Sequence, residues 1–122
     1  MSDRLRLLTS VDELEPVVAG SFTRPVLVFK HSLTCGTSAW AHEEVEALLD
    51  GPPLSVDVCV VHVQASRALS NAIAERLGVR HQSPQALLVR HGQVVWHASH
   101  HHLSQAAIAA ALQQHVSQPT AI

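Results

Sequence analysis

The sequence predicts a single α/β domain, spanning residues 1–122, in which helices alternate with the strands of a mixed β-sheet. A chain of 122 residues is the usual length of one domain and can bury a core without metal or disulfide support. Short apolar, β-branched runs alternate with stretches whose apolar residues recur at helical spacing. The last two strand-like runs are separated only by His91-Gly92, which predicts a β-hairpin.

The first half of the chain predicts two strand–helix units. Strands are expected at Leu5–Leu8 and Pro25–His31, and helices at Val11–Val18 and Ala39–Leu49. Ser10 and Glu13 fit a capping box, in which the serine side chain and the glutamate side chain each accept from a backbone N–H at the helix start. Gly20 is the expected end of the first helix.

The second half of the chain predicts a central strand, a helix, the hairpin and a last helix. Strands are expected at Val56–Val63, Ala86–Arg90 and Gln93–His97, and helices from Ser66 to Gly78 and from Ser104 to Val116. Helical crossovers imply parallel pairing among the first strands, and the hairpin adds an antiparallel edge. The order β-α-β-α-β-α-β-β-α is that of the thioredoxin fold.

Composition and charge exclude several classes of partner. The formal charge of −2 gives no reason to expect binding to nucleic acid or to an anionic membrane. No apolar run approaches the length of about 20 residues that spans a bilayer, and Met1–Arg4 lacks the apolar segment of a signal peptide. We therefore expect a cytoplasmic protein whose two cysteines are kept reduced.

Cys35 lies between a predicted strand and a predicted helix, in the polar segment Ser32–Ser38. Backbone N–H groups and the positive end of a helix dipole favour an anion at such a place. They lower the pKa of a cysteine and make its sulfur a nucleophile near neutral pH. A buried core cysteine is the alternative, but the small polar neighbours suit close approach by another molecule. We therefore expect Cys35 to be the catalytic nucleophile.

Cys35 has no partner cysteine in this motif. The two-cysteine exchange motif would need a second cysteine at position 38, which is Ser38. A serine can hydrogen-bond a thiolate but cannot close a disulfide, so a second thiol molecule must resolve a mixed disulfide on Cys35. Cys59 lies within an apolar strand and is expected to be a buried, structural residue.

Residues around Cys35 are candidates for binding a thiol substrate. Lys30 and His31 end the preceding strand, where a cation would stabilise a thiolate or meet a carboxylate on a small thiol. Strand alternation lets only one of them share the face of Cys35, and a solvated lysine and a satisfied histidine are the alternatives. Ser83-Pro84 is interpreted either as a trans proline that opens a strand or as a cis-proline loop beside Cys35. The predicted substrate-binding set is Lys30, His31, Thr34, Gly36, Thr37, Ser38, Ser83 and Pro84.

The run from His97 to His102 is the densest histidine cluster in the chain. His97 and His100 have a His-x-x-His spacing, which is compatible with a metal site. A metal site also needs defined geometry and supporting partners, and no Cys, Asp or Glu lies close in sequence. We interpret the run as a polar strand end and connector, and expect neither a metal nor a tightly bound cofactor.

Three segments resemble a known family in the correct order. Phe29–Ser32 and Thr34-Cys35 look like the active-site segment of the monothiol bacilliredoxin family, the YtxJ-type thioredoxin-like proteins. Gly78–Leu88 is similar to the proline-loop segment of that family, and Val95–His100 looks like its last strand. The resemblance covers most of the chain from about Val26 to His100.

The resemblance implies a cytoplasmic bacterial protein that works with bacillithiol, a glucosamine–malate–cysteine thiol. Cys35 would attack the disulfide between a client protein and bacillithiol, carry bacillithiol as a transient covalent adduct, and be freed by another thiol. The implied partners are bacillithiolated client proteins and a low-molecular-weight thiol. Gly36 replaces the proline that often follows the cysteine in this family, which keeps a backbone N–H but loosens the turn.

Two other functions compete with this interpretation. Cys35–Ser38 resembles the Cys-Gly-Phe-Ser motif of monothiol glutaredoxins, which bind an iron–sulfur cluster between two subunits, although Thr37 stands in place of the phenylalanine. The remaining alternative is a thioredoxin-like interaction module with an inert cysteine.

Overall fold

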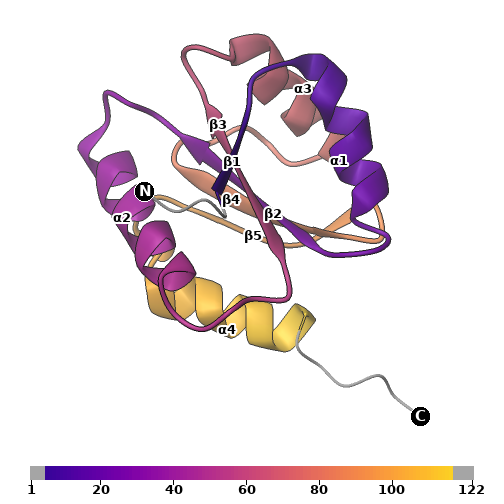
Figure 1. Cartoon of the computed structure of the whole chain (residues 1–122). Coiled ribbons are helices and arrows are strands. Elements are labelled where there is room, and N and C mark those ends of the chain that lie inside the picture. Colours follow the sequence, from indigo (N-terminus) through magenta and orange to yellow (C-terminus); the bar gives the residue numbers. More distant parts are fainter. Residues whose placement is uncertain (1–4, 117–122) are drawn as a thin grey trace.

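The computed structural model describes residues 5–116 and is built around a five-stranded sheet (Figure 1). The strands are β1 (Leu5–Leu8), β2 (Val26–His31), β3 (Asp57–His62), β4 (Gln85–Arg90) and β5 (Gln93–Ser99). The helices are α1 (Leu14–Gly20), α2 (Gly36–Leu49), α3 (Arg67–Leu77) and α4 (Gln105–His115), with 3₁₀ turns η1 (Val11–Glu13) and η2 (His100–His102). The expectations for Met1–Arg4 lie outside the described residues.

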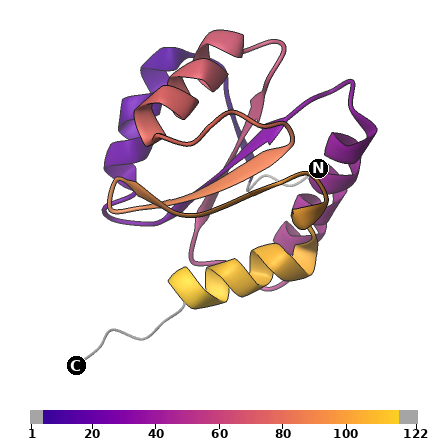
Figure 2. The ribbon, with the colours of Figure 1, turned by 180° about the vertical axis from the view of Figure 1, so that it is seen from behind.

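The strand order is β1-β3-β2-β4-β5, so β2 occupies the centre of the sheet. β3 pairs in parallel with β1 and with β2, whereas β4 pairs antiparallel with β2 and with β5. Helices α1 and α3 cover one face of the sheet, and α2 and α4 cover the other (Figures 1 and 2). The predicted order of elements, the parallel pairing of the first strands and the antiparallel hairpin at the edge are all confirmed.

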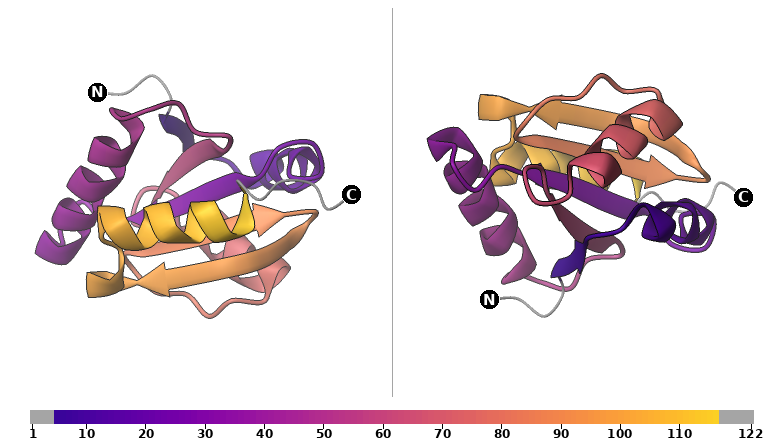
Figure 3. Two further views of the ribbon diagram at one scale, coloured as in Figure 1. Left: turned by 90° about the horizontal axis from the view of Figure 1, so that it is seen from below. Right: turned by 90° about the horizontal axis from the view of Figure 1, so that it is seen from above.

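Alternation along β2 divides its buried side chains between two cores. All six residues of β2 are buried, as expected of a strand covered on both faces. Leu27 and Phe29 belong to the core under α2 and α4, and Val26 and Val28 to the core under α1 and α3. Figure 3 shows the same sheet and helices from below and from above. By the same alternation, Lys30 and His31 at the end of β2 enter different layers.

Helix α2 begins at Gly36, three residues before the predicted start at Ala39. Cys35 is its N-cap, with extended backbone angles (φ −110°, ψ 126°), and its carbonyl oxygen accepts from the Ala39 N–H at 3.0 Å. The sequence obscures this start because residues 36–38 are small and polar and show no apolar periodicity. The correction puts the cysteine directly at the helix terminus.

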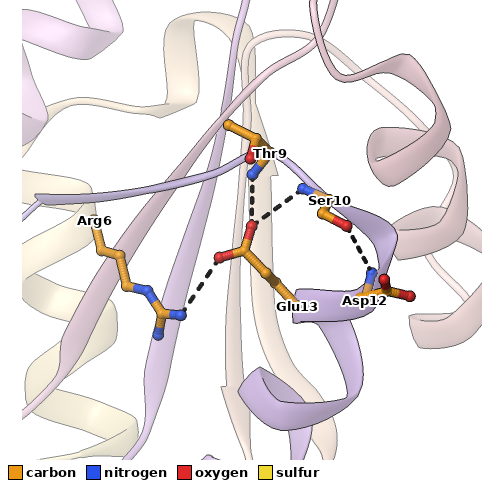
Figure 4. Close-up of polar contacts among 5 residues, drawn as sticks. All are labelled: Arg6, Thr9, Ser10, Asp12 and Glu13. Carbon is orange, nitrogen blue, oxygen red and sulfur yellow. Dashed lines mark hydrogen bonds and ion pairs between the residues drawn. The ribbon is translucent and has the colours of Figure 1, made fainter.

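The predicted capping box at the start of η1 is confirmed (Figure 4). The Asp12 N–H donates to Ser10 Oγ at 3.2 Å, and Glu13 Oε1 accepts from the backbone N–H groups of Thr9 (2.9 Å) and Ser10 (3.1 Å). These two backbone donors, aided by the nearby Arg6, hold the pKa of the Glu13 carboxyl below its usual value. The box fixes the turn that leads from the edge strand into α1.

Two of the other predicted helix ends are also formed as expected. Ser104 caps α4 by accepting from the Ala107 N–H at 3.1 Å. Gly78 ends α3 in the left-handed conformation at φ +69°. Ser66 precedes α3 as predicted, but its side chain forms no capping hydrogen bond.

Within residues 5–116, no helix has both the length and the apolar character needed to cross a bilayer.

Replacing Gly78 with alanine should lower the free energy of unfolding by about 1 kcal/mol. Nothing lies within 4 Å of a Cβ at this position, so the cost comes from the positive φ and not from a clash. Gly20→Ala is the matched control. Nothing lies within 4 Å of a Cβ at Gly20 either, and Gly20 is the last residue of α1. Urea unfolding should show Gly20→Ala to be neutral or stabilising, and equal losses in both variants would contradict the conformational explanation.

Candidate functional site around Cys35

Cys35 lies at the carboxyl end of the central strand and at the N-terminus of α2. Its side chain is half-buried and forms no capping hydrogen bond. In the described part of the chain, the N–H groups of Gly36, Thr37 and Ser38 donate to no protein acceptor. These donors and the helix dipole therefore favour a negative charge at this terminus, which is the position of the sulfur.

Ser38 joins the first turn of α2 to the end of β2. Its side chain is fully buried, and its Oγ accepts from the Ser32 N–H at 2.8 Å and lies 2.7 Å from His31 Nδ1. A serine can hydrogen-bond a thiolate, but both of these contacts run to the end of β2 and to the residue that follows it. Ser38 thus holds the helix start in position beneath the cysteine.

His31 is packed among aromatic rings on the α2 side of the sheet. It stacks on His42 at 4.7 Å and on Phe29 at 5.5 Å, and its edge meets His62 at 5.8 Å. Burial, with added repulsion from His42 and His62, lowers the pKa of His31 to about 4. His31 is therefore neutral at pH 7, which favours the alternative of a satisfied histidine over that of a cation.

Lys30 points into the opposite layer, toward α3. Its side chain is fully buried, and its Nζ donates to the Ser70 carbonyl oxygen at 3.0 Å and lies 3.2 Å from His81 Nδ1. The alternative of a solvated lysine is wrong. Burial lowers the pKa of Lys30 to about 8. Direct contact with a substrate, the predicted role, is not supported by this placement, because the ammonium is enclosed and already has protein partners.

Gln64 is a residue of the site that the sequence interpretation missed. Its Nε2 donates to Ser32 Oγ at 2.6 Å and to Thr34 Oγ1 at 3.1 Å, so it bridges two residues of the loop that precedes Cys35. Gln64 follows the carboxyl end of β3, beside β2. The tendency of ligand sites to form at such strand ends is the signal that could have identified it.

The peptide bond between Ser83 and Pro84 is cis, which confirms the second interpretation of this segment. The β2–β4 ladder pairs Lys30 with Gln85, so Pro84 lies at the next position, beside the end of β2 and at the edge from which the Cys35 loop departs. Ser83 Oγ is buried and has no hydrogen-bond partner among the described residues. Contact of this loop with a substrate stays a prediction.

Cys59 is buried in the middle of β3, as predicted. It is 3% exposed, and burial raises the pKa of its thiol to about 11, so the sulfur is protonated at neutral pH. It borders a cavity at the amino ends of β2 and β3, away from the edge that carries Cys35. The two cysteines therefore differ sharply in environment.

The histidine run begins in the last strand and ends at the same end of the sheet as the Cys35 loop. His97 lies in β5, and His100–His102 form the exposed turn η2. The His100 N–H donates to the Pro84 carbonyl oxygen at 3.0 Å, and the His101 ring lies 6.2 Å from that of Trp40 in α2. In residues 5–116, no three His, Cys, Asp or Glu side chains form a group that could hold a metal ion.

Solved structures with the same fold are numerous among known proteins. A protein described as a proposed oxidoreductase with a thioredoxin fold is 34% identical, with a TM-score of 0.75, and the match covers 88% of this chain and 92% of that chain. Thioredoxin from Fasciola hepatica is 21% identical, with a TM-score of 0.71 over 90% of this chain and 98% of its own. A mutant thioredoxin from Halobacterium salinarum is 21% identical, with a TM-score of 0.73 over 98% of this chain and 97% of its own.

The thioredoxin fold, with one cysteine at the start of α2 and a cis-proline loop at the same end of the sheet, defines a thioredoxin-like protein with a thiol–disulfide redox role. The chain can also be assigned to one family within this class. Residues 6–108 match the model of the monothiol bacilliredoxin BrxC family, and the chain belongs to this family. The fold and the family expected from the sequence are confirmed.

Acidification should destabilise the protein through His31. The folded-state pKa of about 4 lies below the ordinary 6.5, so the unfolded chain binds more protons between these values. Stability is therefore lost as the pH falls from 6.5 to 4, by up to about 3 kcal/mol from this group. Urea unfolding of the wild type and of His31→Phe at pH 7 and pH 4.5 should show a smaller loss in the variant. Parallel losses would contradict this assignment.

Alkaline conditions should stabilise the protein through Lys30. The pKa is lowered from 10.5 to about 8, so the unfolded chain binds more protons between these values. The stability of the wild type relative to Lys30→Met should be constant below pH 8 and rise by up to about 3 kcal/mol toward pH 10.5. Unfolding curves of both proteins at pH 7, 9 and 10 test this prediction. If the stability of the wild type relative to Lys30→Met fell with rising pH, the predicted direction of the effect would be wrong.

Proposed function

We propose that the protein removes bacillithiol from mixed disulfides on client proteins by a monothiol mechanism. The observation that carries the proposal is the position of Cys35 as the N-cap of α2, with free N–H groups at the helix start and no cysteine at position 38. Membership of the monothiol bacilliredoxin family supports bacillithiol as the thiol that is carried.

The exchange takes place in two displacements. The Cys35 thiolate attacks the bacillithiol sulfur of the mixed disulfide; a new S–S bond forms, the old one breaks, and the client cysteine leaves as a thiolate. A second low-molecular-weight thiol, as thiolate, then attacks the bacillithiol sulfur of the adduct and releases Cys35. Each step exchanges one disulfide for another, so no net oxidation occurs.

The residues around Cys35 have distinct parts in this scheme. The N–H groups of Gly36, Thr37 and Ser38 stabilise the sulfur as an anion, both before attack and when it leaves. Gln64 fixes the preceding loop through Ser32 and Thr34. The backbone of Ser83, before the cis-proline, offers hydrogen bonds to the incoming disulfide.

Treatment of the reduced protein with oxidised bacillithiol should add the mass of one bacillithiol to Cys35, measured by intact-mass analysis and located by peptide mapping. Cys59→Ser should be labelled like the wild type, because the Cys59 thiol is buried and protonated. Cys35→Ser should remain unlabelled. An unmodified wild type, or an adduct that persists in Cys35→Ser, would eliminate the proposal.

A further inference from the structure

The four segments that meet around Cys35 contain no aspartate or glutamate. They are residues 30–42, 62–70, 78–86 and 97–105, which form the strand ends, loops and helix starts at this edge of the sheet. The chain has ten acidic residues, and all of them fall outside these four segments in the sequence. The same four segments hold Lys30, Arg67, Arg80 and eight of the ten histidines. Lys30 is buried, so in this chain of net charge −2 the exposed arginine and lysine side chains of the four segments are Arg67 and Arg80.

The helix starts at this edge increase the positive potential. Neither α2 nor α3 has an acidic residue in its first turn, where a carboxylate would be stabilising. The first residue of α3 is instead the exposed Arg67, a cation at the end of the helix where a cation is unfavourable. Such an arrangement costs stability and therefore calls for a functional explanation.

Arg67 and Arg80 lie on the α3 side of the cis-proline loop. Arg80 is exposed, and its carbonyl oxygen accepts from Gln85 Nε2 beside Pro84. Burial lowers the pKa of His81, with added repulsion from Lys30 and then from Arg67, so the Arg67 guanidinium lies on the side of α3 that faces this ring. Neither guanidinium group forms a hydrogen bond or ion pair with another described residue.

Three acidic residues outside these segments have other partners. Glu13 binds the backbone at the start of η1 and Arg6, and Glu15 pairs with Arg76 at 2.8 Å, both beside the outer strand β1. Glu44, farther along α2, accepts from the Gln105 N–H at 2.8 Å. In these contacts, none of the three carboxylates pairs with Arg67 or Arg80.

We propose that Arg67 and Arg80 are specificity-determining residues that make the site select small thiols bearing carboxylates. The inference rests on the proposed monothiol exchange and names the chemistry that the thiol must carry. A guanidinium forms paired, charge-assisted hydrogen bonds with a carboxylate. The imidazoles of η2 border the other side of the cis-proline loop and add N–H donors.

Three disulfides of similar size and different charge test the proposal. Reduced protein is reacted with 3,3′-dithiodipropionate (dianion), bis(2-hydroxyethyl) disulfide (neutral) and cystamine (dication), and the Cys35 adduct is timed by intact mass. For each disulfide, the rate with the protein is divided by the rate at which a neutral cysteine derivative reacts with that disulfide. This normalisation removes the differences between disulfides that come from their leaving groups. The normalised rates should fall in the order dianion, neutral, dication, and the differences should shrink in high salt.

The variant Arg67→Gln/Arg80→Gln should lower the normalised ratio of dianion to neutral rates by at least about threefold. Arg76→Gln is the matched control, because Arg76 is paired with Glu15 away from the site, and it should leave the ratio unchanged. Equal normalised rates in the wild type, or a ratio unmoved by the double substitution, would overturn the inference. Failure of all three disulfides to modify Cys35 would instead refute the exchange function.

Discussion

The bond between Ser38 and the end of β2 is the contact on which the site depends. Ser38 Oγ accepts from the Ser32 N–H and meets His31 Nδ1, so the first turn of α2 is tied to the central strand by a buried hydroxyl. This contact places the helix terminus, with its free N–H groups, at Cys35. The residue at the position of a resolving cysteine therefore has a structural role that a thiol, a weaker hydrogen-bonding group, would fill less well.

The surroundings of this contact tie the end of β2 to the helical layers on both faces of the sheet. His31 fills the layer under α2 as a neutral ring, stacked between Phe29 and His42. Lys30, the neighbouring residue, links β2 to α3 through Ser70 and to the cis-proline segment through His81. Both residues carry an unfavourable burial of an ionisable group. Their position beneath a reactive loop is consistent with stability being given up for a defined geometry.

The charge distribution separates reactivity from recognition. The helix terminus acts on the sulfur at short range, through backbone donors that any thiol substrate would encounter. In the proposed recognition, the guanidinium groups of Arg67 and Arg80 and the imidazoles of η2 contact the rest of the substrate. Such a division allows one backbone arrangement to react with thiols of different chemistry. The choice among these thiols then depends on the exposed side chains around the site.

The sequence by itself determined the order of elements, the place of Cys35 between a strand and a helix, and the family. Strong apolar runs, a capping box at Ser10 and the glycine stop at Gly78 are local signals, and they are confirmed because nearby residues alone decide them. The tertiary structure decided what distant residues do to one another. The start of α2 at Gly36, the neutral state of His31, the burial of Lys30 and the bridge from Gln64 all depend on contacts between separate strands and helices. Alternation along a strand shows that two neighbours face different layers, but only the packed layers show which one is buried among rings and which one finds a carbonyl partner.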